Sequence, residues 1–258
     1  MTKVTRPVAL ITGARRGIGQ ACGIALAKAG FDIAATDLVL DQACKESAVA
    51  FSAAGANSEF FAHDLADIAV HAGLVKAVTA RFGQIDCLVN NAGRGAVARG
   101  DVLDLSPENF DAVMDVNARG TLFLSQAVAK AMLAEGGSGH ARSIVTITSV
   151  SAEMASPDRT DYCVSKAALA MAMRCLALRL APEGIAVFDV RPGIIRTDMT
   201  AQVAERYDKA IAEGLVPAKR WGEPADVADI VAGLASGKFG FATGTVIQAD
   251  GGLSIPRL

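Results

Sequence analysis

The sequence has few cysteines and no run of apolar residues long enough to cross a membrane. Its five cysteines, at positions 22, 44, 87, 163 and 175, are widely spaced and form no Cys-x-x-Cys pair, so they indicate neither a disulfide framework nor a zinc site. No run of 18 uncharged apolar residues occurs, and residues 1–7 contain no apolar stretch of the signal-peptide kind. We therefore expect a cytoplasmic protein with no membrane partner.

An excess of charge of either sign is also missing. Lysine and arginine number 25 and the acids 27, interspersed along the chain, for a net charge of −2. This balance gives no basic surface for nucleic acid or for an anionic membrane. His63, His71 and His140 lack the spacing of metal ligands, so we expect no bound metal and place all three histidines in loops or in solvent.

Small and apolar residues are abundant. The 258 residues are 52% hydrophobic and include 25 glycines, and short β-branched runs alternate with alanine-rich stretches. This alternation is typical of buried parallel strands that alternate with helices. No linker, low-complexity segment or repeat interrupts it, and we expect residues 1–258 to form one α/β domain.

The pattern places strands and helices as follows. Strands are expected at 8–12, 32–36, 58–62, 87–89, 144–148, 187–190 and 245–248, and helices at 18–29, 107–134 and 162–181 and after Pro224. Residues 198–222 are less regular, and we interpret them as a mobile lid over the site.

Residues 12–19, Thr-Gly-Ala-Arg-Arg-Gly-Ile-Gly, join the first expected strand to the first helix. Such a turn lets backbone N–H groups at a helix N-terminus approach a pyrophosphate, although a plain strand–helix connection is the alternative. Asp37 ends the second strand 18 residues beyond Gly19, where a βαβ unit places an acid on the adenosine ribose. Asp64 follows the third strand and either contacts the adenine or caps a helix. The sequence thus predicts a dinucleotide site.

Two asparagine positions have a structural or a functional reading. After the fourth strand, the small residues of Asn90-Asn91-Ala92-Gly93 leave room for a flat ligand, and an asparagine there can tie neighbouring strand ends together. Asn117 lies in the middle of the helix expected at 107–134. An asparagine competes with the helical backbone for hydrogen bonds, so Asn117 is either functional or simply exposed.

Tyr162 and Lys166 are one turn apart if they lie on a helix, and they then share a face. A free phenol titrates near ~10, and a neighbouring cation lowers its pKa towards the range of a general base. The only other tyrosine, Tyr207, has isoleucine four residues on. The pair is either a proton-transfer unit or two surface residues that fall four apart by chance.

In order and spacing, these pieces resemble the compact, single-domain type of the short-chain dehydrogenase/reductase family over nearly the whole chain. The matching pieces are Thr12-Gly13-x-x-x-Gly17-Ile18-Gly19, Asn90-Asn91-Ala92-Gly93, Asn117, Ser149, Tyr162-x-x-x-Lys166 and Pro192-Gly193. The resemblance implies a Rossmann-type, doubly wound three-layer α/β sandwich with a parallel seven-stranded sheet. It also implies an NAD(P)-dependent oxidoreductase that transfers a hydride between a nicotinamide and a carbonyl or secondary alcohol.

The resemblance also implies roles for site residues. Tyr162 would be the acid/base, Lys166 would lower its pKa and contact the nicotinamide ribose, Asn117 would anchor a water, and Ser149 would bind the substrate oxygen, with Ser151 its competitor. Gly13 and Ile18 would lie along the pyrophosphate, Asn91 near the adenosine, and Ile195 and Thr197 near the carboxamide. The full cofactor-binding set is Gly13, Arg16, Gly17, Ile18, Gly19, Asp37, Leu38, Asp64, Leu65, Asn91, Ala92, Gly93, Tyr162, Lys166, Pro192, Gly193, Ile195 and Thr197.

The choice between NAD and NADP turns on charges near the adenosine ribose. The Asp37 carboxylate would repel a 2′-phosphate, and two unit charges 4 Å apart interact by about 4 kcal/mol at an effective dielectric constant of 20. Arg15 and Arg16 could screen such a phosphate, although Arg16 could instead pair with Asp37. We expect NAD, with NADP as the alternative.

The substrate is less well defined by the sequence. The overall sequence looks most like bacterial 3-oxoacyl-acyl-carrier-protein reductases and less specifically like sugar or polyol dehydrogenases. Because members of this family act on many substrates, the choice between these classes stays open. Arg94, Arg99 and the charged loop 156–161, with Asp158 and Arg159, suggest a polar or anionic substrate, unless these charges only solvate the rim. A non-catalytic dinucleotide-binding protein and an epimerase or dehydratase of the extended family are the other readings. The family also implies a homotetramer.

Overall fold

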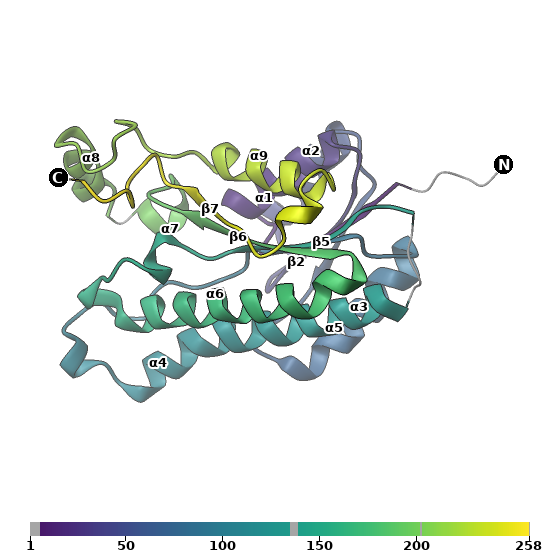
Figure 1. The fold of residues 1–258 in the computed structure, drawn as a ribbon, viewed down its shortest axis with the longest axis horizontal. Coiled ribbons are helices and arrows are strands. Elements are labelled where there is room, and N and C mark those ends of the chain that lie inside the picture. The colour runs from purple at the N-terminus through teal and green to yellow at the C-terminus, as the bar shows by residue number, and fades with distance from the viewer. Residues whose placement is uncertain (1–5, 135–138, 202, 258) are drawn as a thin grey trace.

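The computed structural model, which describes residues 6–134, 139–201 and 203–257, has a parallel seven-stranded sheet at its centre (Figure 1). The strands lie in the order β3-β2-β1-β4-β5-β6-β7. Strand order therefore reverses between β1 and β4, and a doubly wound sheet binds ligands outside the carboxyl ends of its strands at such a point. The strands are β1 Val8–Thr12, β2 Asp32–Asp37, β3 Ser58–Ala62, β4 Cys87–Asn90, β5 Arg142–Ile147, β6 Ile185–Pro192 and β7 Val246–Ala249.

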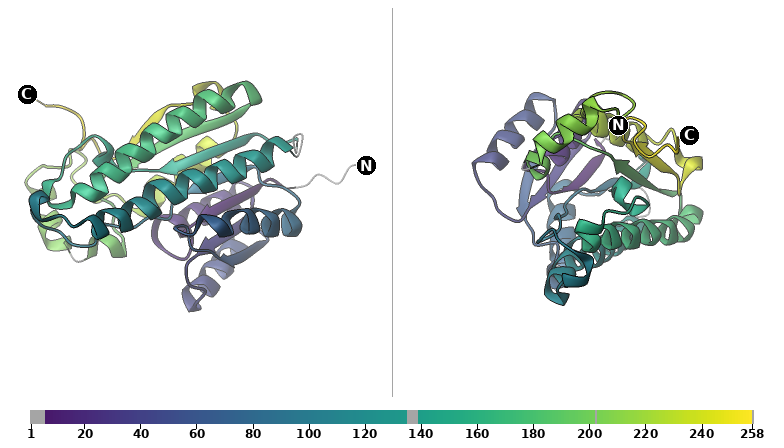
Figure 2. Two further views of the ribbon diagram at one scale, coloured as in Figure 1. Left: turned by 90° about the horizontal axis from the view of Figure 1, so that it is seen from below. Right: turned by 90° about the vertical axis from the view of Figure 1, so that its left-hand side faces the viewer.

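Helices cover both faces of the sheet, which makes three layers (Figure 2). Helices α1, α2 and α9 pack on one face, and α3, α5 and α6 pack on the other. The helices are α1 Gly17–Lys28, α2 Gln42–Ala53, α3 His71–Phe82, α4 Pro107–Met114, α5 Thr121–Ala134, α6 Thr160–Leu180, α7 Asp198–Ala201, α8 Ala204–Ala212 and α9 Pro224–Ala235. This architecture confirms the expected Rossmann-type fold. In the described part of the chain, no helix has both the length and the apolar character needed to span a membrane.

The central strands are buried along their whole length because both of their faces are covered. Every residue of β1, β4 and β6 is buried, as expected when crossover helices lie on both sides of a parallel sheet. Strands β5 and β6 are longer than the sequence predicted, since pairing runs from Arg142 with Ile185 to Ile147 with Val190. The sequence pattern thus located the strands but not their ends.

The helix expected over residues 107–134 is interrupted. A π-helical turn, Asp115–Gly120, separates α4 from α5 and contains Asn117. At Gly120 an added Cβ would lie only 2.0 Å from the carbonyl oxygen of Leu65, so a glycine is needed where the turn passes this loop. Such turns break the regular hydrogen-bond ladder of an α-helix and are frequent at functional sites.

Residues 198–222 are more regular than predicted. They include α7 and α8, and residue 202 lies outside the described part. Ile194, Ile211, Val216 and Trp221 form a small apolar cluster that is separate from the two sheet cores. The mobility of this stretch stays a prediction.

Of the two histidines His63 and His71, only His63 lies in a loop as expected, whereas His71 begins α3 and its placement in a loop or in solvent was wrong. His63 and His71 are 7% and 2% exposed, and the centres of their rings lie 5.0 Å apart. His71 Nε2 lies 3.2 Å from the Leu65 carbonyl oxygen. Burial lowers the pKa of both rings, that of His63 to about 4. The rings are buried because the loop after β3 lies against the start of α3, a contact between segments that local polarity does not reveal.

Candidate active site

The glycine-rich turn between β1 and α1 leaves its backbone open. Gly13 and Gly17 have φ of +65° and +57°, a conformation that side chains disfavour. At Gly19 an added Cβ would lie 2.2 Å from the Gly13 carbonyl oxygen. Arg16, at the N-cap, makes no side-chain hydrogen bond to the first turn of α1. The helix therefore presents uncapped N–H groups and its positive dipole end to the crevice, which suits a pyrophosphate.

Side chains at the end of β4 fix the position of this turn. The Thr12 hydroxyl accepts hydrogen bonds from the backbone N–H groups of Asn91 and Ala92, both at 3.0 Å. Asn91 Nδ2 donates to the carbonyl oxygens of Thr12 and Gly13, both at 2.9 Å. The side chain of Asn91 thus ties β1 to β4 beside the expected cofactor.

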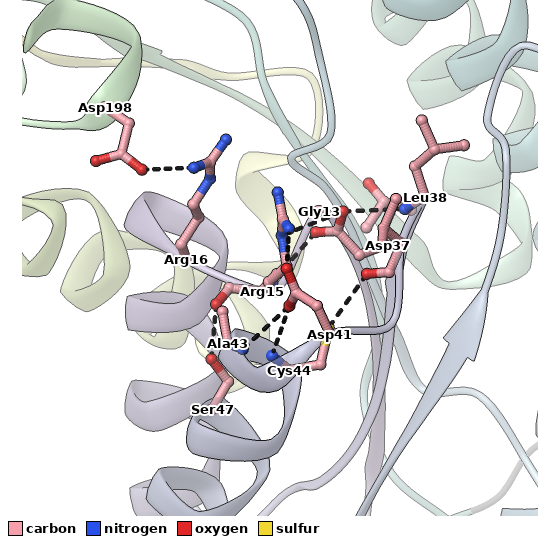
Figure 3. Close-up of polar contacts among 12 residues, drawn as sticks. Gly13, Arg15, Arg16, Asp37, Leu38, Asp41, Ala43, Cys44, Ser47 and Asp198 are labelled. Atoms are coloured by element: carbon pink, nitrogen blue, oxygen red, sulfur yellow. Dashed lines mark hydrogen bonds and ion pairs between the residues drawn. The ribbon is translucent and has the colours of Figure 1, made fainter.

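Asp37, at the end of β2, lies against the same turn (Figure 3). Its carboxylate accepts from the Leu38 N–H at 2.9 Å and from the Arg15 N–H at 3.3 Å. The Arg15 guanidinium is 3.7 Å from Asp37 and 2.5 Å from Asp41. Asp41 in turn accepts from two N–H groups at the start of α2. Arg15 is therefore held between two carboxylates.

Arg16 does not pair with Asp37, as one reading of the sequence allowed. Its guanidinium lies 2.7 Å from the carboxylate of Asp198, the first residue of α7 (Figure 3). Both side chains are mostly exposed, so this ion pair contributes little to stability. Arg15 and Arg16 are adjacent but point in different directions, which leaves Asp37 with Arg15 alone.

Asp64 caps a turn and not a helix. Its carboxylate accepts the Ala66 N–H at 2.9 Å, while Leu65 is buried. Leu38 is 64% exposed at the edge of the crevice. An apolar side chain so exposed beside a crevice is suited to contact the flat face of a ring.

Tyr162 and Lys166 share one face of α6, as predicted. Lys166 Nζ lies 5.7 Å from the centre of the Tyr162 ring and donates a hydrogen bond to the carbonyl of Ile147 at 3.1 Å. Burial lowers the pKa of Lys166 to about 8, while the charge of Asp189 acts in the opposite direction. The lysine is thus a buried cation directed at the end of β5.

The pKa of Tyr162 is raised, the reverse of the direction expected from the sequence. Burial of the phenol is the main cause, and interactions with the Ser149 hydroxyl and the Arg159 guanidinium partly offset it. The Lys166 ammonium donates its hydrogen bond to the Ile147 carbonyl, so any effect of its charge on the phenol is exerted through space. In this form Tyr162 holds its proton at neutral pH.

Asn117 is fully buried, which excludes the reading of an exposed polar residue. Its Oδ1 accepts the Arg94 N–H at 2.8 Å, and its Nδ2 donates to the Arg94 carbonyl at 2.9 Å and to the Ser165 hydroxyl at 3.0 Å. Ser165 Oγ donates to the Tyr162 carbonyl at 2.8 Å. Sequence reasoning missed Ser165, although it lies three residues after Tyr162, one turn along the same helix.

Gly93 brings the asparagine turn up to these groups. An added Cβ at Gly93 would lie 3.1 Å from Asn117 Oδ1 and 3.6 Å from Lys166 Nζ. The segment after β4, the π-helical turn and α6 therefore meet at one place.

Ser149 and Ser151 have different surroundings. Ser149 follows β5, is 7% exposed, and accepts the Ser151 N–H at 3.1 Å. The Ser151 hydroxyl instead accepts a hydrogen bond from Arg159 at 3.1 Å. The two serines therefore do not occupy equivalent positions towards Tyr162.

An ionic network around a buried arginine lies behind the site and was not foreseen. Arg191, in β6, is 1% exposed and pairs with Asp189 at 2.9 Å and with Glu153. Thr148 donates a hydrogen bond to the same aspartate. The signal in the sequence was an acid and a base inside the apolar strand 185–192. The charge of Asp189 opposes the effect of burial on the pKa of Lys166. Through this charge the network acts on the site electrostatically.

The segment after β6 returns to the glycine-rich turn. Gly193 passes Asp250 so closely that an added Cβ would lie 2.8 Å from the Asp250 Cβ. Ile195 is buried, and Thr197 Cγ2 lies 3.7 Å from the place of a Cβ on Gly17. Two expected cofactor residues, Gly17 after β1 and Thr197 after β6, are thus neighbours although they are far apart in the sequence.

The charges at the rim are partly satisfied by one another. Arg99 pairs with Asp158 at 2.9 Å, and Arg206 of α8 lies 3.9 Å from the same carboxylate. Arg94 is exposed. Asp158 and Arg99 therefore fit the reading in which charges solvate the rim, whereas Arg159 lies over the Tyr162 ring.

Residues 13–254 match a family model described as enoyl-(acyl carrier protein) reductase. The fold is similar to a 3-oxoacyl-[acyl-carrier protein] reductase from Brucella melitensis in complex with NAD, with a TM-score of 0.96 and 59% identity over 99% of this chain and 100% of that one. It is also similar to a putative 2-deoxy-d-gluconate 3-dehydrogenase from Agrobacterium tumefaciens with bound NADP, with a TM-score of 0.85, 31% identity and 97% of each chain covered. A curated relative, 2-dehydro-3-deoxy-D-gluconate 5-dehydrogenase of Dickeya dadantii, is 36% identical over 95% of this chain and 94% of its own.

Proposed function

Because the chain belongs to the short-chain dehydrogenase/reductase family and is an NAD(P)-dependent oxidoreductase acting on carbonyl and alcohol groups, we propose that Tyr162, Lys166, Ser149 and Asn117 form its catalytic group. The observation that carries this proposal is their convergence at the carboxyl edge of the sheet. Lys166 Nζ is 5.7 Å from the Tyr162 ring, and Asn117 is joined to the same helix through Ser165. A dinucleotide-binding protein without turnover would not need these buried polar groups.

The residues beside the glycine-rich turn fit a bound dinucleotide. Gly13, Gly17 and Gly19 leave the N-terminus of α1 accessible to a pyrophosphate, Asp37 and Leu38 would receive the adenosine, and Ile195 and Thr197 would lie at the nicotinamide end. The remaining members of the expected set, Arg16, Ile18, Asp64, Leu65, Asn91, Ala92, Gly93, Pro192 and Gly193, are assigned by the same analogy.

The chemistry proposed for this chain is proton transfer at the Tyr162 phenol. The nicotinamide supplies the hydride for reduction, or accepts it for oxidation, when it is bound. For reduction Tyr162 gives its proton to the substrate oxygen, and for oxidation it takes that proton back. The raised pKa of Tyr162 keeps the proton in place at neutral pH. Ser149 donates to the same substrate oxygen and holds it beside the phenol.

Lys166 and Asn117 would support proton transfer at Tyr162 and would not contact the substrate carbon that gains or loses the hydride. Lys166 is close enough to stabilise negative charge on Tyr162 through space. All three hydrogen bonds of the Asn117 side chain go to protein groups. A water on the proton path would therefore be held by a backbone carbonyl of the π-helical turn, where the ladder is broken.

We infer NAD as the preferred cofactor. Asp37 would face a 2′-phosphate, and Arg15 is already engaged by Asp37 and Asp41. Arg16 is directed to Asp198 and away from Asp37. Both arginines would have to leave a carboxylate before they could neutralise a phosphate, so neither offsets the repulsion by Asp37 at low cost.

Two substrate classes are supported. The 59% identity to the 3-oxoacyl-[acyl-carrier protein] reductase from Brucella melitensis favours a 3-oxoacyl thioester as the substrate. The charged loop before Tyr162 and the curated relative at 36% identity favour a sugar, a polyol or an acid derived from one. The test is a turnover assay with NADH and NADPH against keto-thioesters, keto sugars and cyclic ketones, and with NAD against the corresponding alcohols. Absence of turnover with every member of the panel would overturn the proposed function.

We also propose a cytoplasmic homotetramer and a substrate lid at residues 198–222. All five cysteines are free, as a reducing compartment would keep them. Phe123 of α5 and Met171 and Leu178 of α6 expose 38%, 55% and 81% of their surface. Exposed large apolar side chains on two adjacent helices suit a face that packs against another copy.

A further inference from the structure

Arg159 occupies an unusual position next to Tyr162. Its guanidinium carbon lies 5.3 Å from the centre of the Tyr162 ring, and its Nη2 donates to the Ser151 hydroxyl at 3.1 Å. Ser151 is buried and lies two residues beyond Ser149. Arg159 is therefore a half-buried cation at the edge of the proposed reaction centre, and it approaches Tyr162 from the charged loop.

The charge of Arg159 has no carboxylate partner at ion-pairing distance within residues 6–134, 139–201 and 203–257. Its sequence neighbour Asp158 is engaged by Arg99 and Arg206. Only one of its N–H groups is used within that part of the chain, and the buried Nε has no partner there. A guanidinium has five donors in a fixed fork that matches a carboxylate. Such a cation is costly to bury unless an acceptor is supplied from elsewhere.

A cavity of about 230 Å³ adjoins this arginine. It lies between the loop at residues 98–105, the start of α4 and the loop at residues 157–161, and the Gly100 N–H joins the two loops by donating to the Asp158 carbonyl at 3.3 Å. A cavity of this size suits a small polar molecule and not a long acyl chain.

The cavity also contains acids, and these have other roles. Asp101 accepts the Leu103 N–H at 2.9 Å, and Asp104 is exposed. Asp161 accepts the Tyr162 N–H at 2.8 Å, and its second oxygen is buried without a partner. Asp161 lies in the first turn of α6, where the helix dipole stabilises a negative charge. The charge of Arg159 also interacts with that of Asp158, but within the described residues no carboxylate accepts a hydrogen bond from its guanidinium.

We propose that Arg159 binds a carboxylate of the substrate, so that the preferred substrates are small oxo acids and hydroxy acids with a free carboxylate rather than thioesters or neutral polyols. This inference rests on the proposed function and selects between its two substrate classes. The fork of Arg159 takes the carboxylate, and the reacting carbon then lies a few bonds away at Tyr162 and Ser149. Arg159 is a specificity-determining residue in this arrangement.

The test uses two matched pairs of probes. Acetoacetate is compared with S-acetoacetyl-N-acetylcysteamine in reduction, and D-gluconate with D-glucitol in oxidation, for the wild type, Arg159→Gln and Arg159→Lys. Arg81→Gln is the control, because it removes the same charge from an exposed ion pair with Glu59 that lies outside the cavity. The wild type should prefer at least one carboxylate over its neutral counterpart. Arg159→Gln should lower kcat/KM for that carboxylate at least about 30-fold, chiefly through KM, as removal of one partner of a charge pair does.

The other outcomes separate the explanations. Arg159→Lys should restore part of the loss, and Arg81→Gln should leave the preference unchanged. Equal losses of kcat/KM for both members of a pair would overturn the inference and place Arg159 in proton transfer. A wild type that turns over only the neutral probes would overturn the inference and leave the proposed function intact. If neither member of a pair reacts, calorimetric titration of the NADH-bound protein with acetoacetate and gluconate decides the matter, since failure of both to bind in an Arg159-dependent way would overturn it.

Discussion

The ammonium nitrogen of Lys166 lies 5.7 Å from the centre of the Tyr162 ring, yet its hydrogen bond goes to the carbonyl of Ile147. The cation therefore acts on the phenol through space and not by direct contact. Two functions are separated in this arrangement. Tyr162 carries the proton, and Lys166 supplies a charge whose magnitude depends on pH.

The role of the phenol is tested by Tyr162→Phe, which keeps the ring and removes the proton. We expect kcat to fall at least ~10²-fold, the scale of general acid–base catalysis, with the dissociation constant for the cofactor little changed. Tyr207→Phe removes the other tyrosine hydroxyl and is the control. Turnover by Tyr162→Phe at a rate near that of the wild type would disprove the assignment.

The buried charge of Lys166 predicts an unusual dependence of stability on pH. Its pKa is lowered from 10.5 to about 8 by burial, so the folded protein at pH 7 retains a cation that burial disfavours. Lys166→Met should abolish activity but raise the free energy of unfolding at pH 7 by on the order of 1 to 3 kcal/mol. This range is the free-energy equivalent of the pKa shift minus the contribution of the hydrogen bond that the variant loses.

This advantage of Lys166→Met should shrink between pH 8 and pH 10.5. In that window the unfolded chain still holds the lysine proton while the folded wild type has released it, so wild-type stability rises with pH relative to the variant. Urea unfolding at pH 7 and pH 9.5 measures the difference. Lys130→Met, at an exposed position on α5, is the control, and an advantage of Lys166→Met that does not depend on pH would argue against a buried charge.

Cofactor preference is tested by Asp37→Ser. We expect the wild type to have a higher kcat/KM with NADH than with NADPH. The substitution should move the ratio towards NADPH at least about tenfold, because a repulsion of up to about 4 kcal/mol is removed. Asp32→Ser is the matched control, since Asp32 lies at the opposite end of β2 and pairs with Arg6. A wild type that prefers NADPH, or a ratio that Asp37→Ser leaves unmoved, would show that Asp37 does not select the cofactor.

The proposed lid can be followed through Trp221, the one tryptophan in the sequence. Its Nε1 donates to Asp208 of α8 at 2.7 Å, and its ring meets that of Tyr207 edge-on. If residues 198–222 close over the substrate, these contacts change and the fluorescence of Trp221 should shift when cofactor and substrate bind together. Cofactor alone gives the reference signal, and an unchanged spectrum at saturation would count against closure.

The oligomeric state is tested by light scattering at micromolar concentration, where we expect the mass of a tetramer. Leu178→Lys places a charge in the exposed apolar face of α6 and should yield smaller species. Val49→Lys alters a comparably exposed apolar residue on α2, away from that face, and should leave the mass unchanged. A monomeric wild type would disprove the proposal.

The sequence predicted the features that depend on local periodicity and missed those that depend on contacts between distant segments. Apolar runs and glycine spacing sufficed for the sheet and for the turn before α1. They could not show that Arg15 turns to Asp37 while Arg16 turns to Asp198. The directions of two neighbouring side chains in a tight turn depend on the backbone conformation of the folded protein. The burial of His63 and His71 has the same origin, since it depends on the contact between the loop after β3 and the start of α3.

The candidate site shows the same division. The spacing of Tyr162 and Lys166 predicted that they share one helix face. The raised pKa of Tyr162 depends on burial of the phenol, which residue spacing does not predict. Asp189 and Arg191 were visible only as charges inside an apolar strand. Their pairing is local to β6, where residues two apart share a face, but their contacts with Thr148 and Glu153 depend on the end of β5 lying beside β6.

The π-helical turn at Asp115–Gly120 has a consequence for the gene. Each residue of an α-helix turns the chain by about 100°, so the loss of one codon in this stretch could restore a regular helix but would rotate either Asn117 or the whole of α5 to another face. The same deletion in the exposed segment 97–100 would disturb much less buried structure. The number of codons in this stretch is therefore constrained, because the length of the helix helps to form the site. Substitutions, which leave the length unchanged, do not test this constraint.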